Sequence, residues 1–509
     1  MKQIKSLHGI LGLLYITLSI VFIVLAKLTP GVVDAFSIYW MFTFAALVLG
    51  IIILIHPNGI TVATYISRIF TGSLFMVSGL IKSNDPLGFS YKLEEYFDER
   101  SLGTFFASFH EVALPLAIII SSAEVLLGLA VLVGGKAKIT NWILLAMTLF
   151  FAWLTWYTAS CNDAQQEALN AGISFNKLCV NDCGCFGDAL KGSVGRSLTP
   201  WESFYKDITL LFFVLVLLLQ NKKIKLNTLK DDLIILPISL ILIFAFSGGL
   251  FHWNFPFYFT LVTVLIYAII KLLPLINAYK EWLTAIVLGS VCLVFTIYCL
   301  KKLPIKDFRP YAVGKNILQQ MKLPEGAQPD VYETLLTYKN TQTGEIKEFT
   351  QQSYPWDDST WVWVSTNNKL IKQGDKATIT DFTIIADDGN DYAEDYLSDT
   401  EPVFMLIVYN VSKTNKAAFE KINKLANDCN SEGKTFIALT ASGYEEVEKL
   451  RHDTQAMYDF YTCDEITLKT IIRSNPGLLL LKEGTVLAKW NDANIPDYKT
   501  VKEKYLNNN

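Results

Sequence analysis

The chain has 509 residues, of which 51% are hydrophobic, and its mean hydropathy is positive. The core of a soluble protein of this length needs less apolar residue, so the composition excludes a wholly soluble protein and predicts membrane spans. The formal net charge of -4 provides no basic surface, which argues against nucleic acid as a partner.

Nine apolar windows approach the roughly 20 residues that a helix needs to cross the hydrocarbon core of a bilayer. We therefore predict an α-helical polytopic membrane bundle of about nine spans. The windows are 7–28, 35–56, 60–82, 114–133, 139–159, 203–220, 232–252, 257–273 and 282–300. The first is long for the apolar part of a signal peptide, so we interpret it as an uncleaved anchor.

The placement of lysines predicts the orientation of these spans. With the N-terminus inside, the short inner loops collect lysines, whereas the longer outer loops carry fewer Lys and Arg per residue. The inner lysines are Lys2, Lys5, Lys136, Lys138, Lys222, Lys223, Lys225, Lys230, Lys271 and Lys280. An odd number of spans then places all residues after 300 outside, which is the periplasm for a bacterial inner membrane protein.

After the last span, the apolar windows give way to patterns of strands and helices. Residues 331–387 alternate apolar and polar side chains, with turns expected at Asn367-Asn368 and Asp387-Asp388-Gly389, and predict a small β unit. Strands are then expected over 403–409, 435–439, 478–481 and 486–490, with helices over 413–427 and 445–451. Strands that alternate with helices indicate an α/β unit.

Four of the eight cysteines, Cys161, Cys179, Cys183 and Cys185, lie in one predicted outer loop, 160–202. Cys183 and Cys185 form a C-x-C pair, whose disulfide closes a small, strained ring and is therefore readily reduced. Three interpretations stay open: a redox-active pair, two structural bridges, or a four-thiolate zinc site. Zinc ranks last, because only Cys179 and Cys183 have the usual ligand spacing.

Four motifs fall within the first 220 residues. They are Cys-Gly-Cys-Phe-Gly-Asp at 183–188, Leu-Thr-Pro-Trp-Glu-Ser-Phe-Tyr-Lys-Asp at 198–207, Gly-Leu-Ile-Lys-Ser-Asn-Asp-Pro-Leu-Gly-Phe at 79–89, and Ala-Glu-Val-Leu-Leu-Gly at 123–128. Together they resemble the DoxX/MauE family of redox-associated membrane proteins. The resemblance implies a four-helix membrane core linked to disulfide or quinone chemistry. Cys183 and Cys185 match the cysteine motif of the family directly, whereas Cys161 and Cys179 lie in what looks like an added segment.

The last hundred or so residues resemble a thioredoxin-like domain, chiefly through the run that begins Ser-Asn-Pro-Gly at 474–477. The resemblance implies a cis proline before a strand. The position after the strand 403–409, where C-x-x-C is expected, reads Asn-Val-Ser-Lys at 410–413, so the usual dithiol is absent. Cys429, in a predicted helix, and Cys463, just before one, are expected to pack in the core, with a bridge or a mixed disulfide as the alternative.

Two ionisable residues, Arg68 and Glu124, lie within predicted spans. Counted from the inner ends of their spans they have nearly the same depth, so we expect an ion pair between them. This pair either locks the bundle or belongs to a proton or quinone site. Near the outer ends, Trp156 and Trp201 either form part of an aromatic belt or stack on a quinone ring.

The sequence divides into four regions. They are 1–220, a DoxX/MauE-like membrane domain with the four-cysteine outer loop 160–202; 221–300, three further transmembrane helices; 301–395, a connector and the small β unit; and 396–509, a thioredoxin-like domain lacking C-x-x-C. The predicted fold class is therefore an α-helical membrane bundle followed by an extracytoplasmic α/β thioredoxin-like domain, with a small β unit before it.

The preferred function is a membrane thiol-disulfide oxidoreductase or redox relay on the outer face of the inner membrane. A substrate thiolate would attack the Cys183–Cys185 bond, and electrons would pass to Cys161 and Cys179 or to a quinone. The expected partners are membrane lipid and a periplasmic thiol or disulfide protein. No metal and no firm cofactor are implied, quinone being an option. The alternative is a non-catalytic scaffold or accessory subunit whose thioredoxin-like domain docks a partner protein.

Overall fold

The computed structural model describes residues 7–28, 38–56, 58–180, 182, 184–323, 325–329, 331–372, 374 and 376–507. The chain forms two compact units. The membrane unit comprises Met1–Ala168 and Ser174–Arg309, and the tail unit comprises Leu169–Ile173 and Pro310–Asn509.

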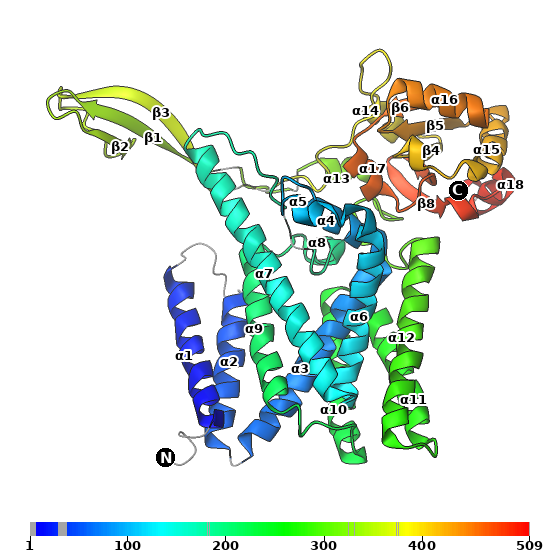
Figure 1. The fold of residues 1–509 in the computed structure, drawn as a ribbon. Helices are drawn as coiled ribbons and strands as arrows, with labels where there is room; N and C mark the ends of the chain where they lie inside the picture. Colours follow the sequence, from blue (N-terminus) through cyan, green and yellow to red (C-terminus); the bar gives the residue numbers. More distant parts are fainter. Residues whose placement is uncertain are drawn as a thin grey trace. The chain divides into compact units, whose positions relative to one another are not determined.

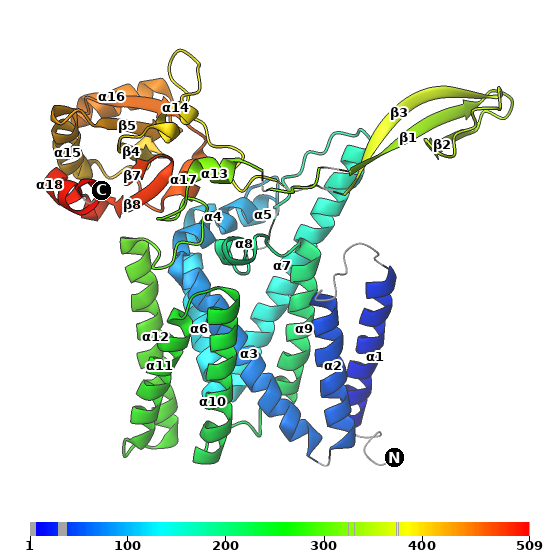
Figure 2. The same ribbon diagram turned by 180° about the vertical axis from the view of Figure 1, so that it is seen from behind.

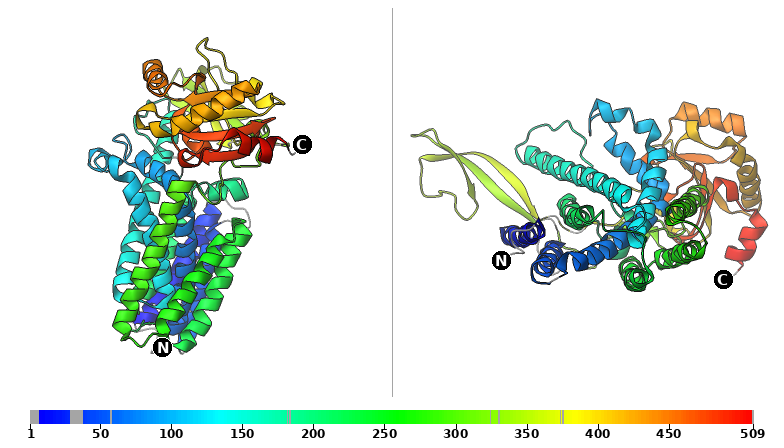
Figure 3. Two further views of the ribbon diagram at one scale, coloured as in Figure 1. Left: turned by 90° about the vertical axis from the view of Figure 1, so that its right-hand side faces the viewer. Right: turned by 60° about the horizontal axis from the view of Figure 1, so that its bottom comes forward.

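The long helices of the membrane unit run side by side (Figures 1 and 3). They are α1 Leu7–Leu28, α2 Ile38–Ile55, α3 Gly59–Asn84, α6 Ala113–Val133, α7 Ala137–Asn170, α9 Pro200–Leu219, α10 Leu229–Phe244, α11 Phe255–Leu272 and α12 Asn277–Lys302. A helix thus occupies each of the nine predicted windows.

Among the described residues, six helices are long and apolar enough to cross a membrane. They are Gly59–Asn84, His110–Val133, Ala137–Asn170, Leu229–Leu250, Phe255–Leu272 and Asn277–Lys302. These six helices make the chain a polytopic membrane protein. Helix α9 is 20 residues long but is not one of the six, and its first eight residues include Glu202, Lys206 and Asp207.

Short helices lie at one end of this bundle (Figures 1 and 2). They are α4 Pro86–Tyr96, α5 Thr104–Ala107 and α8 Asp188–Val194, while a 3-10 turn, His110–Val112, and a π-helical turn, Ala245–Leu250, adjoin α6 and α10. Asp85 begins α4 by accepting a hydrogen bond from the Gly88 amide, and Pro86 occupies the first helical position. Helix α4 buries Phe89, Leu93 and Tyr96.

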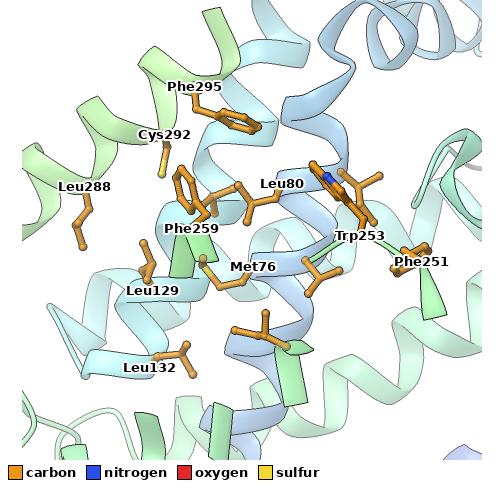
Figure 4. Packing of buried hydrophobic residues seen from close by; sticks show 14 of the residues in the cluster. Met76, Leu80, Leu129, Leu132, Phe251, Trp253, Phe259, Leu288, Cys292 and Phe295 are labelled. Carbon is orange, nitrogen blue, oxygen red and sulfur yellow. The ribbon is translucent and has the colours of Figure 1, made fainter. Parts of the chain in front are cut away.

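Helices α3 and α6 pack closely because glycines line their contact. A methyl group on Gly79 would lie 2.8 Å from the Val125 amide nitrogen and 2.9 Å from the Glu124 Cβ. Small residues let membrane helices approach in this way and so fix their register. In Figure 4, Met76 and Leu80 of α3 lie in a cluster with Leu129 and Leu132 of α6 and with side chains from the later helices. The later residues of the cluster are Phe259 of α11, Leu288, Cys292 and Phe295 of α12, and Phe251 and Trp253 from the turn before α11.

The tail unit contains a three-stranded antiparallel sheet, ordered β2-β1-β3. Its strands are β1 Val331–Asn340, β2 Ile346–Thr350 and β3 Trp361–Lys372, so the small β unit is present. The turn expected at Asn367-Asn368 is wrong, because β3 continues through both residues, which pair with Leu335 and Thr334 of β1. The turn before Gly389 is confirmed, and this glycine has a φ of +81°.

A second sheet of the tail unit has the strand order β6-β5-β4-β7-β8. The strands are β4 Val403–Val408, β5 Thr435–Thr440, β6 Asp459–Thr462, β7 Gly477–Lys482 and β8 Thr485–Asn491. Strands β4, β5 and β6 are parallel, whereas β7 and β8 each run antiparallel to their neighbours. The α/β character is therefore confirmed, although the sequence pattern missed the four-residue strand β6.

Helices surround this sheet (Figure 1). They are α13 Ile317–Met321, α14 Ala393–Ser398, α15 Phe419–Ser431, α16 Tyr444–Thr454, α17 Glu465–Ile471 and α18 Tyr498–Val501. The helix expected from residue 413 begins only at Phe419, because the side chains of Asn410 and Asn415 cap two short 3-10 turns before it. Every residue of β4 is buried, and the bond between Asn475 and Pro476 is cis, as the resemblance implied.

Candidate functional site

The structure joins Cys161, near the end of α7, to Cys179 in the following loop. Their Cα atoms lie 5.6 Å apart, and the disulfide spans 18 positions of the sequence. Both residues are buried. Closing a loop of this length stabilises the folded state by about 3 kcal/mol in the chain-entropy account. Cys183 lies outside the described residues, so its bond to Cys185 stays a prediction.

Hydrogen bonds fix the chain beside this disulfide. The Asn162 side-chain amide donates to the Val180 carbonyl at 2.9 Å, and the Leu178 amide donates to the Arg100 carbonyl at 3.1 Å. Val180 is buried in a cluster with Phe89 of α4. The segment that leads to Cys185 is therefore anchored to α7 and packed beside α4.

The backbone at Cys185 depends on glycines on either side. Gly184 and Gly187 have φ angles of +62° and +49°, which L side chains rarely adopt. The Gly184 amide donates to the Asp182 carboxylate at 2.9 Å, and a methyl group on Gly184 would lie 2.8 Å from the Lys92 Cγ. These two glycines therefore allow a tight turn of the backbone at Cys185.

Lys92 of α4 lies against this turn. Its ammonium is 2.8 Å from Glu95 and 3.6 Å from Asp182. Burial lowers the pKa of Lys92, but the two carboxylates outweigh burial, so the pKa is raised overall. This lysine therefore stays positively charged beside the loop at neutral pH.

A buried network of Ser78, Lys82 and Glu124 connects α3, α6 and the loop. The Lys82 ammonium lies 2.5 Å from the Glu124 carboxylate, and their side chains are only 6% and 2% exposed. Lys82 also donates to the Ser78 hydroxyl at 3.3 Å. Ser78 has two acceptors within reach, the Glu124 carboxylate at 3.0 Å and the Cys185 carbonyl at 3.3 Å. The network thus ends on the backbone of Cys185.

Aromatic rings complete the surroundings of the buried ammonium. Lys82 lies 5.4 Å from the ring centre of Phe89 and 5.0 Å from that of Phe151. Rings at this distance attract a cation through their negative faces, which partly replaces the lost hydration. The ammonium is therefore held by a carboxylate, a hydroxyl and two rings.

The expected ion pair between Arg68 and Glu124 is wrong. Arg68 donates to the carbonyls of Val131 and Leu132 at 2.9 and 3.0 Å and to the Asn227 side chain at 2.5 Å. The predicted depths were counted from the inner ends of the two spans, and this assumed that the beginning of α3 and the end of α6 lie at the same level. Arg68 instead lies at the last residues of α6, so the first two turns of α3 extend past that helix.

Phe186, the residue after Cys185, packs against residues from outside the loop. The Phe186 ring lies 5.6 Å from the Phe251 ring and 5.9 Å from the Lys206 ammonium, and Lys206 pairs with the buried Asp207. Cys185 and Phe186 line a cavity of about 20 Å³. This volume holds about one water molecule, so a quinone ring does not fit there.

The two tryptophans proposed for a cofactor lie on different helices. Trp156 of α7 is 47% exposed. Trp201 of α9 donates to the Asp163 carboxylate at 2.9 Å and contacts the rings of Phe204 and Tyr205. Among the described ring contacts, none joins the two tryptophans, so their role on a quinone stays a prediction.

The tail cysteines are both buried. Cys429 lies in α15 and Cys463 lies two residues before α17, as expected. Burial raises the pKa of Cys429 to about 12 and that of Cys463 to about 11. Since the thiolate is the reactive form, these thiols are poor nucleophiles at neutral pH.

Ser78 and Lys82 are the site residues that the sequence reasoning missed. Lys82 was placed at the edge of a span, where lysines commonly reach the water, but α3 continues to Asn84 and buries it. The spacing of Ser78 and Lys82, one helical turn apart, puts both on one face of α3. Together with Glu124 in the next span, that spacing was the available signal.

These features define a polytopic membrane protein with a disulfide-stapled loop held over a buried charge network. Residues 60–165 match the family described as methylamine utilisation protein MauE, and residues 332–373 match a domain of unknown function, DUF8463. The first match supports a MauE-like membrane protein. It includes Ser78, Lys82, Glu124 and Cys161, but ends before Cys185. No curated protein and no solved structure matches the chain.

Proposed function

We propose that this protein is a thiol-disulfide oxidoreductase of a bacterial inner membrane, with Cys183 and Cys185 as its working pair. The observation that carries the proposal is the fixed position of the Cys185 backbone over the Ser78–Lys82–Glu124 network. A purely structural loop does not require a buried ion pair beneath it, since burying two charges is costly. The MauE-like region supports an accessory role in redox metabolism, as a member of a methylamine utilisation system or of a related one.

The proposed reaction is an exchange of one disulfide for another. A thiolate of a substrate dithiol attacks the Cys183–Cys185 bond and forms a mixed disulfide, and the second substrate thiolate resolves it. The substrate loses two electrons and two protons, and the loop gains them as two thiols. A membrane quinone then accepts both electrons and both protons, becomes a quinol, and restores the loop disulfide.

Cys161 and Cys179 serve as a structural staple in this proposal. Their disulfide is buried, and attack on a disulfide requires access to a sulfur atom. The quinone is therefore preferred over this pair as the route by which electrons leave. It would approach the loop from the lipid side, because the cavity at Cys185 is too small for its ring.

A non-catalytic scaffold is the second candidate, and the tail unit favours it. We propose a thioredoxin-like fold for residues 396–509, supported by the mixed sheet with β4 at its centre. The segment Asn410–Lys413 follows β4 and has no cysteine, and both tail thiols are buried. In this view the tail unit docks a periplasmic protein, whichever function the loop has.

Replacing the tail thiols tests whether the loop cysteines or the tail cysteines carry the oxidoreductase activity. The full chain with Cys429→Ala and Cys463→Ala should oxidise a model dithiol peptide as fast as the unchanged chain, to within about twofold, because raised pKa values keep both thiols unreactive. The peptide's disulfide is followed by mass spectrometry in quinone-containing liposomes. If the double variant loses the activity and still folds, the chemistry belongs to the tail and the proposed loop site is wrong.

The proposed topology has nine spans, with α1, α2 and α9 added to the six long apolar helices. The lysine bias places the N-terminus inside, and an odd number of spans places the tail unit in the periplasm. A reporter fused after Asn509 should be active only outside, and one inserted between residues 221 and 228 only inside. A C-terminal reporter that is active in the cytoplasm would contradict this orientation and move the cysteine loop out of the oxidising compartment.

A further inference from the structure

We infer that Ser78 is a positioning residue for the Cys183–Cys185 pair, and that it connects the buried Lys82–Glu124 pair to the carbonyl of Cys185. The inference rests on the proposed function of that pair. It assigns a role to a hydroxyl on α3 that no motif in the loop would reveal.

The geometry at Ser78 supports this role. The hydroxyl has one proton and two acceptors, the Glu124 carboxylate at 3.0 Å and the Cys185 carbonyl at 3.3 Å. Lys82 donates to the same hydroxyl at 3.3 Å and pairs directly with Glu124. The hydroxyl is thus held between the ion pair on one side and the Cys185 carbonyl on the other.

The connection is stronger when the pair is oxidised. The covalent ring already restricts the Cys185 segment, so the hydrogen bond from Ser78 forms there at little further cost in conformational entropy. Reduction opens the ring, and the same hydrogen bond must then order a freer segment. The Ser78 hydrogen bond therefore stabilises the disulfide relative to the reduced pair.

The test replaces Ser78 with Ala, with Thr as the conservative variant and Ser73→Ala as the matched control. Ser73 is a buried serine on the same helix whose hydroxyl lies 3.5 Å from the Ser239 carbonyl, away from the loop. Ser78→Ala leaves the direct Lys82–Glu124 contact intact, so the variant should fold. The full chain is equilibrated with dithiothreitol and its oxidised form, and the loop peptide is assayed by mass spectrometry.

Ser78→Ala should raise the equilibrium constant for reduction of the pair about fivefold, the effect of one lost hydrogen bond. Ser78→Thr, which keeps the hydroxyl, and Ser73→Ala should stay within about twofold of the unchanged chain. An Ala variant with an unchanged equilibrium constant would overturn the inference and leave the proposed function standing. A pair that no dithiol reduces, even in the unchanged chain, would overturn the proposed function and the inference with it.

Discussion

Replacing Cys185 with Ser is expected to abolish dithiol oxidation by the full chain, while its expression and membrane insertion stay nearly normal. A serine oxygen cannot form a disulfide, so the loop has no bond left with which to oxidise a dithiol. In the reverse exchange, the Cys183 thiolate attacks the disulfide of an oxidised partner, one partner thiol leaves, and no second loop thiol remains to release the mixed disulfide. The variant should therefore accumulate a covalent complex between Cys183 and a partner. Acid quenching, alkylation and non-reducing electrophoresis of membranes will detect that complex.

Cys292→Ala is the matched control, because Cys292 is buried on α12 among apolar residues of the membrane unit and is not one of the four loop cysteines. It should retain activity and trap no partner. Normal activity of the Cys185→Ser protein in cells would remove the redox assignment and leave the scaffold as the better explanation.

Replacing Glu124 with Leu should destabilise the membrane unit by about 3–5 kcal/mol, because it leaves the Lys82 ammonium buried without its carboxylate. The double variant Lys82→Met, Glu124→Leu should recover most of this loss, since it leaves no unpaired charge. Thermal unfolding of the detergent-purified chain compares the single variant, the double variant and the unchanged protein.

An exposed ion pair serves as the control for this second prediction. Lys416 and Asp453 lie 2.9 Å apart on the surface of the tail unit, and Asp453→Asn should change the unfolding temperature little. A Glu124→Leu protein as stable as the unchanged chain would mean that Lys82 reaches water. The buried network under the loop would then not exist as described.

Patterns within single segments predicted much of the fold. Apolar windows located a helix at each of nine places, the alternation over 331–387 located the small β unit, and the expected strands located those of the second sheet apart from β6. These predictions succeeded because periodicity records burial directly. The turn assigned to Asn367-Asn368 failed because residue preference alone cannot reveal a strand whose pairing partner lies some thirty positions away.

The candidate site was less predictable, since it depends on how helices pack against each other. Arg68 and Glu124 were paired by depth, whereas glycines at 72, 79 and 128 set a register that brings Lys82 to Glu124. The contact between Ser78 and Cys185 joins residues 107 positions apart. No local pattern encodes such a contact, although the cysteine motif itself was visible in the sequence.

The most direct test of a redox-active loop is the oxidation state of its four cysteines in the unchanged full chain. Reconstituted protein is treated first with a dithiol and then with a membrane quinone, quenched with acid, alkylated and mapped by mass spectrometry. We expect Cys183 and Cys185 to become reduced and then reoxidised, while Cys161 and Cys179 stay bonded throughout. Loop cysteines that keep one oxidation state through both treatments would contradict the account and identify the loop as purely structural.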